Sequence, residues 1–173
     1  MYDIYSSARN DQWRFTLGKR GARTLIAIGL NPSTAAQEKS DTTVAKVEGV
    51  AERNGFDGFV MLNLYPIRST DFNTLPVGVE PRAFSENLKC IETLVASEPK
   101  PVIWAAWGEN VRARDYFISS AKELISRLQK YGVSWQHFGL LTTAGHPRHP
   151  SRLNYGWSFA KFDTEKYLRT LGV

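Results

Sequence analysis

The sequence predicts an α/β fold of three layers, α/β/α, with helices on both faces of a central, mainly parallel, four-stranded sheet. Four continuous apolar runs are typical of strands that a parallel sheet buries on both faces. Segments with an apolar stripe at helical spacing alternate with these runs, as they do where crossover helices join parallel strands. No internal repeat, low-complexity tract or linker interrupts the sequence, so we expect one domain over residues 1–173.

The four predicted strands cover residues 24–30, 59–64, 102–107 and 138–141. A shorter β-prone run at residues 13–17 predicts an additional antiparallel strand at the edge of the sheet. The glycines at both ends of residues 18–21 predict a turn directly after that edge strand.

Start and stop signals accompany the predicted helices. Ser40 or Asp41 is placed to cap the first helix, Pro81 begins the second, and Gly132 lies just past the end of the third. A short helix closes the chain. The apolar stripes are, in chain order, Val44, Val47, Val50 and Ala51 (with Gly55 after them); Phe84, Leu88, Ile91 and Leu94; Phe117, Leu124, Ile125 and Leu128; and Tyr167, Leu168 and Leu171.

Composition excludes several classes of protein. No apolar run approaches the ~18 residues that cross a bilayer, and residues 1–10 lack the apolar centre of a signal peptide. Cys90 is the only cysteine, which excludes an intramolecular disulfide, a cysteine-ligated zinc site and an iron–sulfur cluster. We therefore expect a cytoplasmic protein, without a membrane partner and monomeric.

The net charge of +5 is unevenly distributed along the chain. Residues 1–50 carry a balance of +2, residues 51–100 a balance of −2, and residues 101–173 a balance of +5. The last part includes the run Gly-His-Pro-Arg-His-Pro-Ser-Arg at residues 145–152. Such an excess is compatible with a nucleic-acid partner, although solvated helix faces also produce it.

Polar and unusual residues follow every predicted parallel strand. They lie at residues 31–35, 63–71, 107–110 and 145–154, and they are rich in Asn, His, Arg, Ser and Pro. In an open parallel sheet, ligands bind beyond the carboxyl ends of the strands. We therefore expect the four loops to converge on one ligand site.

Several chemistries are excluded by missing motifs. The chain has no phosphate-binding P-loop, no dinucleotide-binding glycine fingerprint and no Gly-x-Ser-x-Gly nucleophile turn. His146 and His149 are spaced like metal ligands, but Pro147 and Pro150 keep them off a helix and no acidic or cysteine partner is nearby. We expect no metal site.

Three loop residues are the main candidates for chemistry. Asn63 ends an apolar strand, where its amide either fixes the next loop or hydrogen-bonds the edge of a base. His149, in a stiff loop, either ties down a turn or stabilises an anion on a leaving group. Asn31 either begins a turn before Pro32 or positions a water molecule.

Other candidates have equally plain structural alternatives. Asp41 and Asp71 are the nearest acids, but Asp41 is also a helix cap and Asp71 a partner for Arg68. Tyr65 either stacks on a base or belongs to the core. Leu153, a loop residue, either enters a base stack as a wedge or packs on its own domain. Phosphate contacts are expected from the loop arginines Arg68, Arg148 and Arg152.

The loops together resemble a known family. Leu-Asn-Pro-Ser-Thr-Ala at residues 30–35, Asn-Leu-Tyr-Pro-Ile-Arg-Ser-Thr-Asp at 63–71, Trp-Gly at 107–108 and Gly-His-Pro-Arg-His-Pro at 145–150 resemble a bacterial and phage domain of unknown function, family 1643. The resemblance runs from about Trp13 to Asn154. That family usually has Asp-Asp-Pro-Thr after its first motif, whereas this chain has Ser-Asp-Thr-Thr at residues 40–43.

A more distant resemblance concerns mechanism. Residues 28–32, 61–63, 104–108 and 149–154 are similar, in order, to the motifs of the uracil-DNA glycosylase superfamily. Two departures point away from ordinary uracil as the substrate: Ser33 stands where the mismatch-specific branch has glycine, and the water-activating aspartate of the uracil branch is absent.

This resemblance implies a monofunctional DNA base N-glycosylase that flips a damaged or modified base into the loop site. Asn63 would read the base, in a pocket shared with Pro32, Ser33 and Tyr65. His149 would stabilise the departing base and Asn31 would position water, with Asp41 or Asp71 assisting. Contacts to DNA would come from Arg68, Arg148, Ser151, Arg152 and the wedge Leu153, and no cofactor is implied.

Two further functions stay open on the sequence. The same fold could serve a non-catalytic reader of modified bases or nucleotides, or a hydrolase of free nucleosides. A site that binds another protein is the third possibility, and it would predict no retention of DNA.

Overall fold

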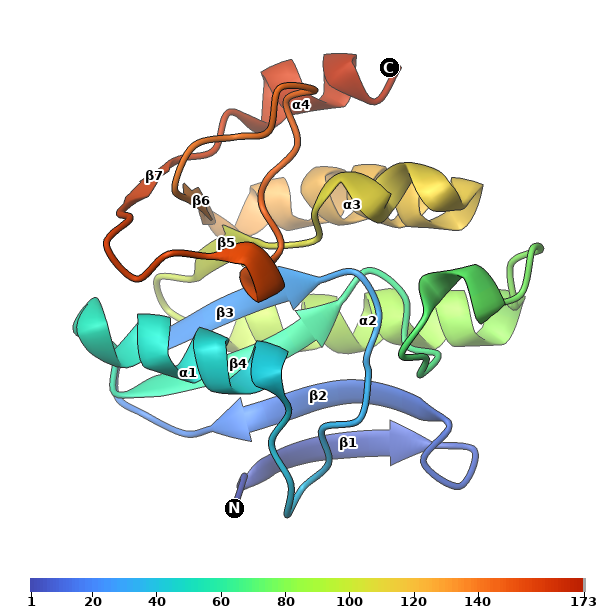
Figure 1. Ribbon diagram of the computed structural model, residues 1–173, viewed down its shortest axis with the longest axis horizontal. Coiled ribbons are helices and arrows are strands. Elements are labelled where there is room, and N and C mark those ends of the chain that lie inside the picture. Colours follow the sequence, from blue (N-terminus) through green and yellow to red (C-terminus); the bar gives the residue numbers. More distant parts are fainter. Residues whose placement is uncertain (173) are drawn as a thin grey trace.

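The computed structural model describes residues 1–172, and its centre is one mixed sheet of seven strands (Figure 1). The spatial order is β1-β2-β4-β3-β5-β6-β7. Strands β4, β3, β5 and β6 run parallel, whereas β2 is antiparallel to β4, β1 to β2, and β7 to β6. The strands are β1 Ile4–Ala8, β2 Trp13–Lys19, β3 Thr24–Gly29, β4 Gly58–Asn63, β5 Val102–Ala105, β6 Ser134–Phe138 and β7 Phe159–Lys161.

Helices lie on both faces of this sheet, with α1 on one face and α2 and α3 on the other (Figure 1). The α-helices are α1 Thr42–Arg53, α2 Pro81–Ser97, α3 Asp115–Leu128 and α4 Thr164–Thr170. Four short 3-10 helices, in the loops and after α3, are η1 Phe72–Thr74, η2 Glu109–Ala113, η3 Gln129–Tyr131 and η4 Pro150–Arg152. The predicted α/β class is therefore confirmed, and none of the helices described is long and apolar enough to cross a membrane.

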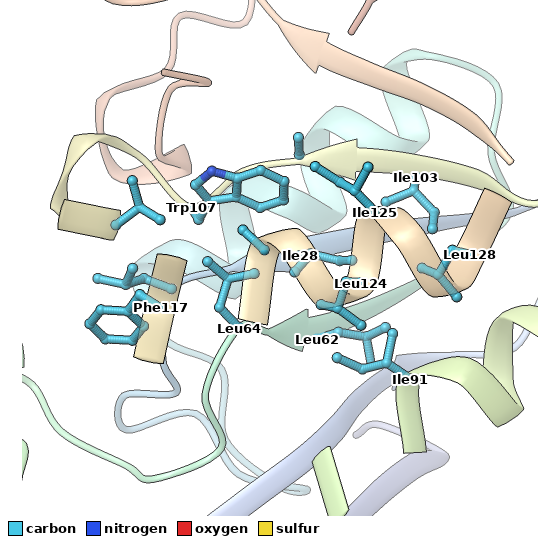
Figure 2. Packing of buried hydrophobic residues seen from close by; sticks show 14 of the residues in the cluster. Ile28, Leu62, Leu64, Ile91, Ile103, Trp107, Phe117, Leu124, Ile125 and Leu128 are labelled. Atoms are coloured by element: carbon cyan, nitrogen blue, oxygen red, sulfur yellow. The ribbon is translucent and has the colours of Figure 1, made fainter. Parts of the chain in front are cut away.

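Alternation along the central strands divides the core into two clusters. In β3, Leu25 and Ala27 pack with the apolar face of α1, whereas Ile26 and Ile28 pack with α2 and α3. Figure 2 shows the second cluster, in which Leu62 and Leu64 meet Leu124 and other side chains of the neighbouring helices. The central strands are thus buried on both faces, as their continuous apolar sequences predict.

The edges of the sheet differ from the prediction, which has four parallel strands and one edge strand. The strand at residues 13–17 lies inside the sheet, because β1 covers its outer side. Gly18 is in this strand and not in a turn: it pairs with Val60, and a Cβ at Gly18 would lie 2.0 Å from the Phe59 carbonyl oxygen. β1 and β7 were not predicted.

The fourth predicted strand, residues 138–141, is also wrong in its position. The strand β6 ends at Phe138, because Gly139 has a φ of +73° and turns the chain away from the sheet. Leu140, which the prediction places in a buried strand, is 81% exposed.

Candidate functional site

A cavity of about 520 Å³ lies beyond the carboxyl ends of β3, β4 and β5. It is walled by the loops that follow these strands, by the first turn of α1 and by the loop that contains η4. Its lining is Arg14, Leu30, Asn31, Ser33, Asp41, Thr43, Val44, Met61, Asn63, Ser69, Thr70, Phe72, Trp107, Gly108, Glu109, Asn110, Thr142, Arg148, His149, Ser151 and Arg152. The expected convergence of the four loops is therefore seen.

Eight of the predicted site residues line this cavity: Asn31, Ser33, Asp41, Asn63, Arg148, His149, Ser151 and Arg152. A larger hollow of about 680 Å³ lies between α2 and the start of β3. Among residues 1–172, however, its lining holds no buried polar side-chain atom that lacks a partner, whereas Asn63 and Arg14 contribute three such atoms to the first cavity. This difference singles out the cavity at the strand ends.

Asn63 is the last residue of β4 and is 1% exposed. Both polar atoms of its amide, Oδ1 and Nδ2, are buried and lack a hydrogen-bond partner in the described chain. The parallel register places Gly29 beside it, and a Cβ at Gly29 would lie 3.0 Å from Oδ1. Because a buried amide without partners is costly, its donor and acceptor are free for a ligand in the cavity.

Arg14 lines the same cavity and was not predicted from the sequence. It is 2% exposed, and its Nη1 donates to the Ala35 carbonyl oxygen at 2.9 Å. Its Nε is buried without a partner, and no carboxylate in residues 1–172 forms an ion pair with it. Burial, with a smaller contribution from the nearby Arg68, lowers the pKa of Arg14 to about 10, and the guanidinium remains charged at neutral pH.

His149 precedes η4 and is held at one ring nitrogen. The Ser151 backbone N–H donates to Nδ1 at 3.2 Å, and the Ser151 hydroxyl lies 2.9 Å from the same atom. Burial lowers the pKa of His149 to about 4, with a smaller opposing effect from Asp41. The ring is therefore neutral at pH 7, and because Nδ1 accepts, its proton is on Nε2, which makes Nε2 a donor.

Gly108 allows the His149 loop to approach the end of β5. Its φ of +77° and ψ of −178° lie in a region that essentially only glycine adopts. A Cβ at this position would lie 3.0 Å from the His149 Cβ. The Trp-Gly sequence after β5 thus has a steric role, because it seats the histidine against the sheet.

Asn31 and Asp41 are both fixed by backbone groups. The Asn31 Nδ2 donates to the carbonyl oxygens of Ser69 at 2.9 Å and Pro32 at 3.1 Å, which leaves Oδ1 as the free acceptor of its amide. In Asp41, Oδ1 accepts from the Val44 N–H and Oδ2 from the Ala35 N–H. Asp41 is therefore the N-cap of α1, as one alternative predicted, and both of its oxygens are engaged.

The predicted site residues that do not line the cavity number five: Tyr65, Asp71, Pro32, Leu153 and Arg68. Tyr65 is fully buried: its ring stacks on Tyr116 at 4.2 Å between centroids, and its hydroxyl accepts from the Glu80 N–H. Asp71 caps η1, Pro32 is buried under the first loop, and Leu153 packs against the α1-side core. Tyr65 is thus a core residue, which corrects its predicted stacking role, and Leu153 is partly buried against its own domain, the other alternative for that residue.

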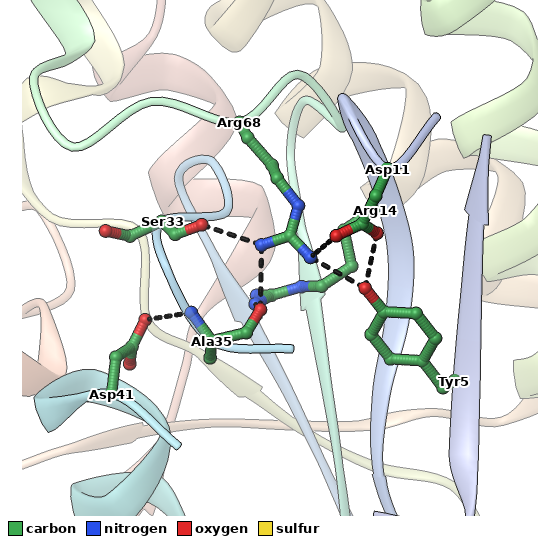
Figure 3. Close-up of polar contacts among 7 residues, drawn as sticks. All are labelled: Tyr5, Asp11, Arg14, Ser33, Ala35, Asp41 and Arg68. Atoms are coloured by element: carbon green, nitrogen blue, oxygen red, sulfur yellow. Dashed lines mark hydrogen bonds and ion pairs between the residues drawn. The ribbon is translucent and has the colours of Figure 1, made fainter. Parts of the chain in front are cut away.

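Arg68 does not line the cavity either, because it ties three segments together (Figure 3). Its Nη1 donates to the carbonyl oxygens of Ser33 and Ala35, both at 2.7 Å. Its Nη2 donates to the Tyr5 hydroxyl at 2.7 Å and forms an ion pair with Asp11 at 3.0 Å. The predicted DNA contact is corrected here, since this guanidinium already holds β1 and the first loop in place.

His146, the other histidine of the loop, is fully buried beneath the site. Its Nε2 accepts from the Arg112 Nε, and its Nδ1 lies 3.0 Å from the Tyr167 hydroxyl, which also accepts from the Trp107 Nε1. Tyr167 of α4 therefore connects this loop to the end of β5. No cluster of three metal-ligating side chains occurs in residues 1–172.

Sequence reasoning missed Glu109 as well as Arg14. Glu109 begins η2, is exposed and lines the cavity. Unlike Asp41, it forms no hydrogen bond or ion pair with any other residue the structure describes, so its carboxylate is free. Glu109 directly follows the Trp107-Gly108 motif in the sequence. An acidic residue in the first turn of a helix is common, however, so the sequence gives no reason to single it out.

Comparison with known proteins gives one match. Residues 13–151 match the model of a family described as a protein of unknown function, DUF1643. No curated protein and no solved structure matches.

Proposed function

The chain belongs to the DUF1643 family, for which no function is described, and from its cavity we propose that it is a DNA base N-glycosylase-type hydrolase. The substrate would be a damaged or modified base flipped out of the nucleic-acid stack into the cavity, because the glycosidic bond is unreachable inside a duplex. The distant similarity of its loops to uracil-DNA glycosylase motifs supports the same proposal.

The observation that carries the proposal is the unpartnered amide of Asn63. One buried donor and one buried acceptor, side by side, complement the Watson–Crick edge of a nucleobase. The cavity volume of about 520 Å³ is within the range of small-ligand sites. Asn63 would thus select a base by two hydrogen bonds that the unliganded protein lacks.

His149 would assist departure of the base. When the glycosidic bond breaks, its electron pair goes to the base, which leaves as an anion. A neutral imidazole with its proton on Nε2 stabilises such an anion by donating a hydrogen bond, and the Ser151 N–H on Nδ1 fixes the required tautomer.

Water would reach the sugar from the Asn31 side of the cavity. The free Oδ1 of Asn31 accepts a hydrogen bond from water and so orients it, but an amide cannot take its proton. Asp41 is engaged at both oxygens and Asp71 lies outside the lining, so Glu109 is the carboxylate we assign to this step.

Cations at the mouth would hold the phosphates. Arg152 is exposed on η4, and Arg148 is half-buried, with its Nε donating to the Leu140 carbonyl oxygen. Lys46 donates to the Ser151 carbonyl oxygen from α1 and adds a third positive charge beside η4. The predicted DNA contacts of Arg148, Ser151 and Arg152 remain part of the proposal.

The test is base release from oligonucleotides that carry a panel of modified bases, single- and double-stranded, assayed as alkali-labile abasic sites. We expect His149→Ala and Asn63→Ala to lower the rate by about 10²–10³, and Glu109→Gln to lower it while Asp71→Asn leaves it unchanged. His137→Gln is the matched control, because that histidine lies outside the cavity. An unchanged rate in folded His149→Ala would contradict its role.

A non-catalytic reader of modified bases, or a hydrolase of free nucleosides, is the second candidate. It is favoured by Asp41, whose two carboxylate oxygens both accept from backbone N–H groups and so do not activate water. A reader would bind DNA with a salt-dependent affinity and form no abasic site. A nucleoside hydrolase would release base from free nucleosides without DNA.

A further inference from the structure

Arg14 gives the floor of the cavity a positive charge that forms no ion pair in residues 1–172, although the carboxylate of Asp41 acts on it from nearby. The side chain is almost fully buried, and only Nη1 meets a partner in residues 1–172, the Ala35 carbonyl oxygen. Arg68 beside it shares that carbonyl oxygen but has Asp11 as its own counter-ion (Figure 3). Of the two guanidinium groups, only that of Arg14, which lines the cavity, forms no ion pair with a carboxylate in residues 1–172.

A β-bulge places Arg14 there. Ser6 pairs with Thr16 and Ser7 pairs with Arg14, so Phe15 is the extra residue in β2 and the alternation of side chains shifts by one. Trp13 and Phe15 pack together in a cluster beside α2, and Arg14 lines the cavity. Bulges of this kind re-aim a side chain and are common next to functional sites.

Arg14 and Asn63 lie on adjacent strands at the same end of the sheet. The Arg14 N–H donates to the Pro66 carbonyl oxygen at 2.9 Å, which sets Arg14 beside the chain just beyond Asn63. The two residues are 2% and 1% exposed, so both belong to the deepest part of the site. Arg148 and Arg152 lie nearer the mouth, where they are available to phosphates of the DNA strand.

We propose that Arg14 forms an anion subsite and that the preferred ligand is an acidic base, one that bears a carboxylate beside the edge read by Asn63. A guanidinium presents paired N–H donors in a planar fork that matches the two oxygens of a carboxylate. The ligand would supply the missing acceptors for Arg14 and, through the same ring, the missing partners of Asn63. This inference rests on the proposed function for the kind of ligand, a nucleobase, and extends it to the charge of that base.

Calorimetric titration of the whole protein with free bases tests the subsite without any catalysis. 5-Carboxyuracil would be compared with uracil, and 5-carboxycytosine with cytosine, because a carboxylate on C5 lies beside the Watson–Crick edge of the ring. A charge-assisted pair of hydrogen bonds predicts that at least one acidic base binds about tenfold or more tightly than its neutral counterpart. Equal affinities in both pairs, or no binding of either acidic base, would overturn the proposal.

Variants of Arg14 locate the effect. Arg14→Gln should abolish the preference for the acidic base, and Arg14→Lys, which keeps the charge without the fork, should retain only part of it. Arg20→Gln is the matched control, since that side chain is 79% exposed on the turn after β2. A folded Arg14→Gln variant with the full preference would contradict the assignment, and the wild-type comparison stands even where this variant does not fold.

Two more ligands identify the source of the negative charge. In a competition titration, one acidic base is bound first and a second ligand is added. Uridine monophosphate and inorganic phosphate should each displace the bound acidic base less effectively than the second acidic base does. If the phosphates bind at Arg14 and the acidic bases do not, the subsite belongs to a nucleotide phosphate and the proposal falls. If acidic bases bind but no abasic site forms in DNA, the proposed glycosylase activity is contradicted and the anion subsite is supported. If only neutral bases are released from DNA, the anion subsite is contradicted and the glycosylase activity is supported.

Discussion

Asn63 and Asn87 are two buried asparagines with different hydrogen bonding. Asn87, on α2, donates from Nδ2 to the carbonyl oxygens of Asn63 and Leu64, so it holds the end of β4, and only its Oδ1 lacks a partner in the described chain. Asn63 itself has no partner for either amide atom in the described chain. Residues that bind a ligand often lower the stability of the unliganded protein. An amide without partners at the bottom of a cavity fits this pattern.

This contrast predicts opposite effects of the same substitution. Asn63→Leu replaces an unsatisfied amide with an apolar group of similar size and should raise the free energy of unfolding by about 1 kcal/mol. Asn87→Leu removes two hydrogen bonds and should lower it by about 1–3 kcal/mol. Urea denaturation of both variants checks the pair, and a loss of stability in Asn63→Leu would show that its amide is satisfied in solution.

His149 should make stability depend on pH. Its pKa of about 4 in the folded protein lies below the usual 6.5, so between these values the unfolded chain binds a proton that the folded chain does not. The free energy of unfolding should therefore fall as pH decreases from about 6.5 to about 4, by up to about 1 kcal/mol per pH unit.

Denaturation of wild type and His149→Gln at several pH values measures this. His146, whose pKa is lowered by burial and by Arg112, is present in both proteins, so their difference isolates His149. Parallel stability curves for the two proteins would contradict the low pKa.

The elements show where sequence patterns suffice and where they do not. A helix cap at Ser40 or Asp41 and the Pro81 start of α2 follow from residue types alone, and the structure confirms the start and places the cap at Asp41. Asn63 and His149 were found because polar groups at strand ends are conspicuous. Arg14 was missed because its orientation depends on the bulge at Phe15, a pairing between β1 and β2 that no local pattern reveals.

Gly108 controls the junction between β5 and η2. Gly108→Ala would force a side chain into a φ of +77° and against the His149 Cβ, so we expect a loss of about 2 kcal/mol in stability and a displaced His149. Gly78→Ala is the matched control, because a Cβ there meets nothing within 4 Å, and should change stability by less than about 0.5 kcal/mol. Urea denaturation and base release check both, and equal effects would contradict the steric role of Gly108.

At the scale of the whole molecule, the strands β3, β4 and β5 and the helices around them could be predicted, whereas β6 was misplaced and the edges of the sheet were missed. β1 and β7 are short and half-exposed, so neither has the continuous apolar sequence that marks β3 or β4. The positive charge is likewise only partly predictable. The sequence shows the surplus in residues 101–173, but only the fold shows which of these basic side chains lie at the mouth of the cavity and which lie on remote surfaces.

That division predicts how DNA binding responds to salt. If Arg152 contacts a phosphate, Arg152→Gln should reduce the slope of log affinity against log salt by about 0.9 for duplex DNA or about 0.7 for single strands. Lys161→Gln, on the remote strand β7, should leave the slope unchanged. Fluorescence anisotropy over a salt series measures both, and equal slopes for wild type and Arg152→Gln would exclude that contact.

The hydrogen bonds of Tyr167 with Trp107 and His146 determine which segments of the chain the site needs in order to keep its structure. The recognisable family sequence, residues 13–151, contains all but one of the cavity-lining residues, yet it leaves out β1 and α4. Tyr5 on β1 anchors Arg68, and Tyr167 on α4 anchors the loop that carries His149. The family segment alone would therefore carry the cavity lining without these two contacts, so a shortened version of this protein should keep both tyrosines.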